Sequence, residues 1–154
     1  IGDIFTGNHP PVEASVGLGF VFVELASAAA LAKAATDSAR MSTLLAGSDA
    51  IGMHIYTSDT QLSDVELRAR MFAPSQGVIE DAATGSANCA LAGLLASIDG
   101  RSDGDRTWHI AQGVEMGRPS RIVATASKSG GNVTAVKVGG ACVFVARGEL
   151  SVPT

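Results

Sequence analysis

The segment from Glu80 to Asn88, EDAATGSAN, carries the densest group of residue types suited to anion binding and proton transfer. Thr84, Gly85 and Ser86 directly precede a run of small and apolar residues that predicts a helix over 85–98. The first backbone N–H groups of a helix have no intrahelical partner and carry the positive end of the helix dipole. Small side chains let a carboxylate or phosphate reach those donors. The pattern therefore predicts an anion site at Thr84, Gly85 and Ser86.

Asp81, just before these residues, could hold a substrate amine or transfer a proton, and the helix terminus favours its ionised form. A small zwitterion would fit both halves of such a site. A purely structural interpretation also fits, because Thr and Ser are common helix N-caps and an acidic residue there stabilises the helix dipole. Neither Thr84 nor Ser86 has a Glu or Gln three residues later, so no capping box is predicted.

Other groups in the chain predict no cofactor and no metal. The Gly-Lys-Ser/Thr signature of a phosphate loop and the GxGxxG pattern are both absent, so nucleotide cofactors are not indicated. His9 lies in an irregular leader, and His54 and His109 lie mid-strand, where each is expected to be a satisfied structural residue. Arg118 lies in a predicted tight turn, and a surface charge is favoured there over a second anion contact.

The two cysteines, Cys89 and Cys142, lie in apolar runs without a CxxC or Cys/His neighbour. They predict neither a zinc site nor a disulfide framework, and Cys89 is expected to be a small buried hydrophobe. This usage fits a reducing cytoplasm, the predicted location. The longest apolar stretch, 87–98, is shorter than a membrane span, and no charged segment opens a signal peptide.

The composition is that of one folded domain. The 154 residues are 46% hydrophobic and 17% charged, enough to bury a core and too apolar for intrinsic disorder. A net charge of -4 and 5% aromatic residues argue against nucleic acid as a partner. Because the chain starts at Ile1 rather than at a methionine, we expect a fragment or a processed product.

Alternating apolar residues and β-branched content predict seven short strands. They are expected at 19–25, 51–58, 67–73, 106–112, 121–127, 133–138 and 141–146, with helices at 27–35, 38–46 and 85–98. Gly139-Gly140 predicts a hairpin between the last two strands. Small or apolar residues occupy every face of the third helix, so it should be covered on all sides. The predicted fold is therefore α+β, with an antiparallel, barrel-like sheet wrapped around a buried central helix.

Three segments together resemble the PhzF-type isomerase family of phenazine biosynthesis. They are ARMFAPSQGVIEDAATGSANCALAGLL, QGVEMGRPSRIV and VKVGGACVFVARGEL, and the resemblance runs from about Val16 to Leu150. The family has the diaminopimelate epimerase fold, with two lobes and the active site between them. The resemblance implies that residues 16–154 form the C-terminal lobe and that residues 1–15 are a connector from a missing N-terminal lobe.

The resemblance also implies cofactor-independent acid/base catalysis. Asp81 and Ser86 correspond to family residues that face the substrate, and the helix N-terminus at Gly85 and Ser86 would bind its carboxylate. The base of the family is a glutamate of the other lobe, helped by a histidine. The thiol base of the related epimerases would fall at Ala82, which argues against thiol-based racemisation. The family's commonest form has proline at this position, a difference expected to affect loop stiffness more than chemistry.

Three hypotheses about function follow. The leading one is an isomerase that moves a proton on a small carboxylate, possibly an amino-substituted one, with the missing N-terminal lobe as partner. The isolated chain is then expected to be inactive. The alternative is a catalytically inert anion-binding or interaction module on the same fold, and thiol-type epimerase activity is the weakest possibility. Exposed strand edges also favour a homodimer.

Overall fold

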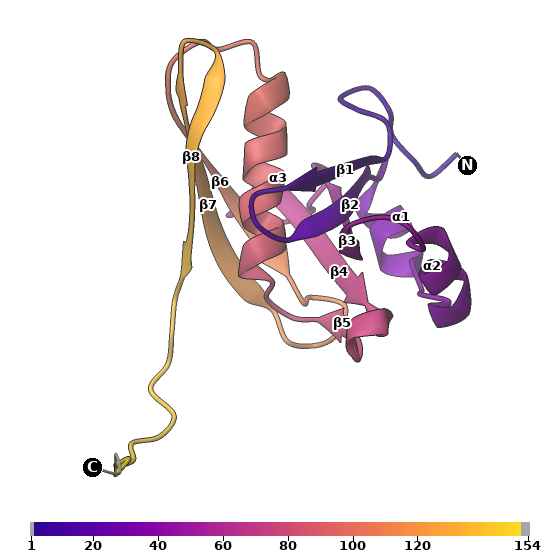
Figure 1. The fold of residues 1–154 in the computed structure, drawn as a ribbon, viewed down its shortest axis with the longest axis vertical. Helices are drawn as coiled ribbons and strands as arrows, with labels where there is room; N and C mark the ends of the chain where they lie inside the picture. The colour runs from indigo at the N-terminus through magenta and orange to yellow at the C-terminus, as the bar shows by residue number, and fades with distance from the viewer. Residues whose placement is uncertain (1, 152–154) are drawn as a thin grey trace.

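The computed structural model describes residues 2–151, which form one β-sheet with helices on both of its faces (Figure 1). In chain order the elements are β1 (Val12–Ser15), β2 (Gly19–Glu24), α1 (Ala28–Lys33), α2 (Ser38–Leu44), β3 (Ala50–Thr57), β4 (Leu67–Ala73), the 3₁₀ helix η1 (Pro74–Gln76), β5 (Val78–Asp81), α3 (Gly85–Ile98), β6 (Gly104–Gln112), β7 (Ser120–Ser129) and β8 (Asn132–Gly140). Six of the seven predicted strands and all three predicted helices are present, while β1 and β5 were not predicted.

The sheet is mixed, so the prediction of a wholly antiparallel sheet is wrong. Its strand order is β1-β2-β3-β4-β6-β7-β8, with β5 paired to β4, and the pairs β2–β3 and β4–β6 are parallel. Helices α1 and α2 connect the first parallel pair, and β5 with α3 connects the second. A strand that follows a crossover connection returns in the same direction, which makes the pair parallel. The sheet curves into a half-barrel.

Helix α3 lies against strands from both ends of the sheet order. It contacts β1 and β2 at one end and β7 and β8 at the other. A Cβ added at Gly93 would lie 3.4 Å from Val16 and 3.5 Å from Val136, so chain segments pack closely against this helix on two sides. The helix buries seven of its fourteen residues, which are Ala87, Asn88, Ala90, Leu91, Ala92, Gly93 and Ala96. Ser86, Ser97 and Ile98 are exposed, so the prediction of a helix covered on all sides is not confirmed. Its C-terminal carbonyls at Ala96 and Asp99 accept hydrogen bonds from Lys128 Nζ, each at 2.8 Å.

Alternation along the strands separates two apolar clusters. Phe20 and Phe22 of β2 and Met71 of β4 face α3, whereas Val23 and Phe72 face α1 and α2 on the opposite side. The two small helices begin with side-chain caps: Ser27 Oγ accepts from the Ala30 N–H and Asp37 Oδ1 accepts from the Arg40 N–H. Strands β2, β3 and β4 therefore contribute side chains to apolar clusters on both faces of the sheet.

The sheet begins inside the predicted connector. Residues 12–15, expected to be irregular, form β1 and pair antiparallel with β2. Ile4 also forms a bridge with Leu25. At least part of the segment 1–15 is therefore integral to this sheet.

The last hairpin differs from its prediction. The turn that joins β7 and β8 is Gly130-Gly131, and both glycines have positive φ (56° and 82°), as a two-residue hairpin turn requires. The predicted Gly139-Gly140 hairpin and strand 141–146 are absent; residues 141–151 extend away from the body without secondary structure (Figure 1). Val143, Phe144 and Val145 are 85%, 81% and 87% exposed. Strand propensity alone does not form a strand where no neighbouring strand takes up the backbone hydrogen bonds.

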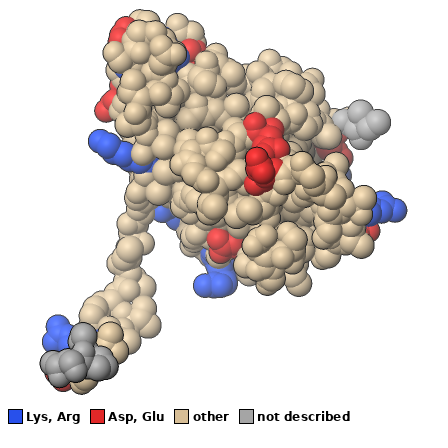
Figure 2. Space-filling view, in the orientation of Figure 1, with Lys and Arg blue, Asp and Glu red and all other residues tan. Residues whose placement is uncertain are grey.

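The surface carries dispersed charge. Figure 2 shows one face on which acidic and basic side chains are scattered among uncharged ones. Among the helices of residues 2–151, none is long and apolar enough to cross a membrane.

Candidate active site

The predicted site lies where β5 ends and α3 begins. Asp81 is the last residue of β5, opposite Met71 of β4, and Thr84 is the N-cap of α3. The Thr84 hydroxyl donates to Asp81 Oδ2 at 2.7 Å and makes no capping bond to the helix backbone. Within residues 2–151, no hydrogen bond uses the N–H of Gly85, Ser86 or Ala87. The first turn of α3 therefore keeps free donors beside a carboxylate.

One of these three residues, Gly85, borders an open hollow. Gly85 lines a hollow of about 490 Å³ whose walls also include Ala83, the segment Pro119–Ile122 and the segment Val138–Cys142. A Cβ added at Gly85 would meet only Val138, at 3.5 Å. The helix N-terminus is thus not blocked by the described part of the chain.

The predicted residues are only partly brought together. Asp81 is half-buried and bonded to Thr84, which is buried, whereas Ser86 is exposed on the first turn of α3. No hydrogen bond in the described range joins Ser86 to Asp81, and neither residue lines the hollow next to Gly85. The geometry thus supports two neighbouring parts. One is the segment Thr84–Ser86 with the free backbone N–H donors of Gly85 and Ser86, which we call the anion cradle, and the other is the Asp81 carboxylate, which the Thr84 hydroxyl holds in place.

A buried glutamine, to which the sequence patterns assign no role, connects the two parts. The side chain of Gln112, at the end of β6, bonds to Asp81, Thr84 and Asn88. Its position as the polar last residue of an otherwise apolar strand end, His-Ile-Ala-Gln, is the sequence signal that could have found it. Its partners lie 24 to 31 residues earlier in the chain, so the sequence alone did not identify them.

Two arginines near the hollow have different surroundings. Arg118 is exposed, as the surface-charge interpretation predicted. Arg121 lines the hollow, and its guanidinium donates to Asp64 at 2.8 and 3.2 Å. This pairing lowers the pKa of Asp64 and holds a cation at the rim of the hollow. Arg121 is therefore a candidate second contact for an anion, a contact for which the sequence offered only Arg118.

The three histidines lie outside the cradle. His9 bonds to the Tyr56 hydroxyl at 2.6 Å and His109 is exposed. His54 is fully buried on β3, and both of its ring nitrogens and Asn88 Oδ1 lack a hydrogen-bond partner within the described structure. The prediction of a satisfied histidine is therefore wrong for His54. Burial lowers its pKa to about 4, and its polar neighbour Asn88 opposes the shift although the pair does not reach hydrogen-bond geometry.

This histidine should make stability depend on pH. The unfolded imidazole has its ordinary pKa of 6.5, so between about pH 6.5 and 4 the unfolded chain binds a proton that the folded chain does not. The free energy of unfolding should fall by up to about 3 kcal/mol as the pH is lowered through this range. Urea denaturation of the wild type and the His54→Gln variant at several pH values measures the difference. Parallel pH profiles for the two proteins would contradict the assignment.

The two cysteines differ in their exposure to solvent. Cys89 is half-buried in α3, and burial raises its pKa, which keeps the thiol protonated. Cys142 is exposed in the C-terminal segment, where the predicted strand 141–146 is absent.

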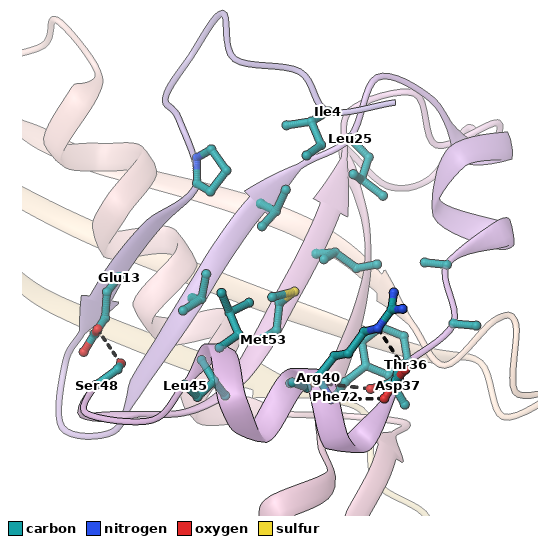
Figure 3. A pocket seen from close by; sticks show the side chains of 18 residues that line it. Ile4, Glu13, Leu25, Thr36, Asp37, Arg40, Leu45, Ser48, Met53 and Phe72 are labelled. Carbon is teal, nitrogen blue, oxygen red and sulfur yellow. Dashed lines mark hydrogen bonds and ion pairs between the residues drawn. The ribbon is translucent and has the colours of Figure 1, made fainter. Parts of the chain in front are cut away.

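A larger hollow lies on the other face of the sheet. It measures about 670 Å³ and lies between α2 and the outer face of β2, β3 and β4 (Figure 3). Its walls are mainly apolar, and its charged residues are engaged: Glu13 accepts from Ser48, and Asp37 caps α2 and pairs with Arg40. It shares no residue with the cradle at Thr84–Ser86 and offers no acid/base pair.

The chain resembles proteins of known family. Residues 2–148 match the family model described as phenazine biosynthesis-like protein. An uncharacterized isomerase of Mesorhizobium japonicum is 33% identical over 146 residues, which are 93% of this chain and 48% of that protein. The trans-2,3-dihydro-3-hydroxyanthranilate isomerase of Pseudomonas aeruginosa is 49% identical over 82 residues, 53% of this chain and 29% of that protein.

Solved structures show the same fold. A Bacillus anthracis protein of the PhzF family superposes with a TM-score of 0.74 at 20% identity, over 92% of this chain and 51% of the other. A Clostridium difficile protein of this group superposes with a TM-score of 0.54 at 18% identity, over 90% and 52%. The chain thus spans about half the length, or less, of the proteins that it matches.

Proposed function

Because the chain belongs to the phenazine biosynthesis-like PhzC/PhzF family, whose similar curated members are named isomerases, we propose that it forms part of a cofactor-independent isomerase. The reaction is a proton shift within a small carboxylate that also carries an amino group. The observation that carries this proposal is the first turn of α3, with free N–H groups, Gly85 at the edge of a hollow, and Asp81 held beside the turn.

In the proposed mechanism the substrate carboxylate binds the N–H groups of Gly85 and Ser86. These donors are fixed before binding, so they stabilise negative charge without reorganisation. Ser86 is exposed on the same turn and can orient the substrate through its hydroxyl. Asp81 Oδ2 accepts the hydrogen bond from the Thr84 hydroxyl, whereas no donor within residues 2–151 is hydrogen-bonded to Oδ1. This oxygen is then the atom that holds the substrate amine or transfers a proton.

We further propose that this unit is one lobe of a diaminopimelate epimerase-like fold, with α3 as its central helix. A base from a second lobe would complete the proton shift, and closure of the two lobes would exclude water from the cradle. Residues 16–154 would form the C-terminal lobe in this arrangement. The chain alone is then expected to show no turnover. The matched lengths, about half of each similar structure, support this arrangement.

One observation favours a second candidate, an inert anion-binding module. Neither Asp81 nor Ser86 lines the hollow, whose walls are mainly small and apolar residues together with Ser120 and Arg121. A module of this kind would bind small carboxylates without proton exchange.

Deuterium incorporation separates the two candidates. We expect the two-lobed protein to exchange a substrate carbon proton with solvent D₂O, and the Asp81→Asn variant to do so at least about 100-fold more slowly. The matched control is Asp105→Asn, an exposed acidic residue at the start of β6, which should leave the rate unchanged. Mass spectrometry of the recovered substrate measures the exchange. An undiminished rate for Asp81→Asn would remove Asp81 from the mechanism, and binding without any exchange would favour the inert module.

A further inference from the structure

The side chain of Gln112 is fully buried and uses all four of its hydrogen-bonding positions. Oε1 accepts from the Thr84 N–H at 3.2 Å and from Asn88 Nδ2 at 2.8 Å. Nε2 donates to the Asp81 carbonyl oxygen at 2.8 Å and to Thr84 Oγ1 at 2.9 Å. An amide has two donor hydrogens and an oxygen with two acceptor sites, so this group is saturated.

The partners permit only one orientation of this amide. A backbone N–H can only donate and a backbone carbonyl can only accept. The Thr84 N–H must therefore face Oε1, and the Asp81 carbonyl must face Nε2. A flipped amide would place oxygen against oxygen at Asp81 and leave two buried donors facing each other at Thr84. Each unmade buried hydrogen bond costs about 1–3 kcal/mol, which fixes the amide.

The fixed amide in turn fixes the Thr84 hydroxyl. Because Thr84 Oγ1 accepts from Gln112 Nε2, its single hydrogen is left to donate, and the acceptor at 2.7 Å is Asp81 Oδ2. An N-cap threonine ordinarily turns its oxygen toward the backbone N–H groups of the first turn. Here the hydroxyl faces the opposite way, and the helix has no side-chain cap.

We propose that Gln112 is a positioning residue that directs the Thr84 hydroxyl away from the helix and onto Asp81. One buried side chain then produces both halves of the site. Through the Thr84 hydroxyl it holds the Asp81 carboxylate, and because that hydroxyl is turned away from the helix, the N–H groups of Gly85 and Ser86 stay uncapped. Asn88 supports the arrangement from the second turn of α3, where Nδ2 bonds to Gln112 and to the Thr84 carbonyl. That the free N–H groups bind a carboxylate rests on the proposed function; the placement of Asp81 does not.

The test substitutes Gln112 and Thr84, the two residues through which the hydrogen bonds reach Asp81, and observes the Asp81 side chain directly. The Gln112→Glu variant keeps the shape of the side chain but replaces the donor with an acceptor. Gln112→Met removes all four bonds without adding charge, and it serves if the glutamate variant does not fold. Thr84→Val removes only the hydroxyl, and Thr84→Ser restores it. The matched control is Gln76→Glu, the same substitution at an exposed position of η1.

Two measurements by NMR give separate answers. In the wild type, the Gln76→Glu variant and the Thr84→Ser variant, each of the two Hα–Hβ couplings of Asp81 should take the limiting value of one staggered rotamer. In Gln112→Met, Gln112→Glu and Thr84→Val they should converge on averaged values. The probe for the anion cradle is 2-aminobenzoate, a small carboxylate that carries an amino group. Its Kd, followed at the Gly85 and Ser86 amides, should rise about tenfold in the Gln112 variants, a loss of about 1.4 kcal/mol of binding free energy.

The outcomes distinguish this inference from the proposed function. An Asp81 side chain that keeps one rotamer in Thr84→Val or in the folded Gln112 variants would overturn the positioning role. Rotamer averaging in those variants supports the role, even where 2-aminobenzoate fails to bind the wild type. That failure would count against the proposed carboxylate site alone.

Discussion

Replacement of Arg70 by methionine is expected to lower the free energy of unfolding by about 3–5 kcal/mol. Arg70 is 7% exposed on β4, and its guanidinium forms two parallel bonds with Glu80, at 2.7 and 2.9 Å. Removal of the cation leaves the Glu80 carboxylate unpaired in a largely buried position. A buried pair that loses one partner is strongly destabilising, because an uncompensated charge remains.

The same guanidinium also donates hydrogen bonds to carbonyl oxygens at the C-terminal end of α1. Its Nη1 donates to the carbonyl oxygens of Leu31 at 2.9 Å and Ala34 at 2.7 Å, and its Cζ lies 5.0 Å from the centre of the Phe72 ring. The methionine variant therefore also loses two bonds to carbonyl oxygens at the C-terminal end of α1. Since Glu80 directly precedes Asp81, the loss should loosen the strand that presents the candidate catalytic carboxylate.

Urea denaturation of Arg70→Met measures this effect. The control is Arg121→Met, whose partner Asp64 is exposed, and we expect little change there because solvent screens such pairs. Equal losses of unfolding free energy in the two variants would contradict the expectation that burial makes the Arg70–Glu80 pair more important for stability than the exposed Arg121–Asp64 pair.

The second large effect is expected for Gly113→Ala, which should lower the free energy of unfolding by about 3 kcal/mol. Gly113 has a φ of +75°, a conformation that residues with a Cβ rarely adopt. A Cβ there would lie 2.4 Å from the Arg118 carbonyl oxygen and 2.8 Å from the Ala82 carbonyl oxygen. Backbone cannot move aside as a side chain can, so the turn or the loop before α3 must shift.

Gly117→Ala is the matched control. Its φ is +70°, but a Cβ there would meet nothing within 4 Å, so only the backbone strain of about 1 kcal/mol applies. Thermal and urea denaturation of both variants isolate the contribution of the clash. Because Ala82 lies between Asp81 and Thr84, the Gly113 variant should also weaken 2-aminobenzoate binding. Equal destabilisation of the two variants would contradict the predicted clash.

Local patterns predicted the helix that carries the site. The small and apolar run from Gly85 onward predicts a helix with Thr84 at its start, and the helix begins there. These features depend on neighbouring residues and are readable from the chain itself. The parallel pairs β2–β3 and β4–β6 were missed because strand direction depends on the crossover connections between them. The predicted helices at 27–35 and 38–46 already indicated one such crossover.

Features that depend on distant partners were not predicted. The sequence placed Thr84 at the helix start but could not show that its hydroxyl faces Asp81, because Gln112 sets that direction from another strand. Strand 141–146 was predicted from composition, yet no neighbouring strand pairs with it within residues 2–151. The role given to Asp81 and Ser86 stays a prediction until exchange is measured.

In the proposed isomerase, the packing of α3 determines where substrate preference can change. Ala87, Ala90 and Ala92 are buried, and a Cβ added at Gly93 would already be in van der Waals contact with Val16 and Val136. A larger residue at these positions would displace the helix and with it every amide of its first turn. Directed evolution toward a new substrate should therefore succeed through loop residues such as Ala83 and Pro119, at the margin of the hollow, and fail through the helix interior.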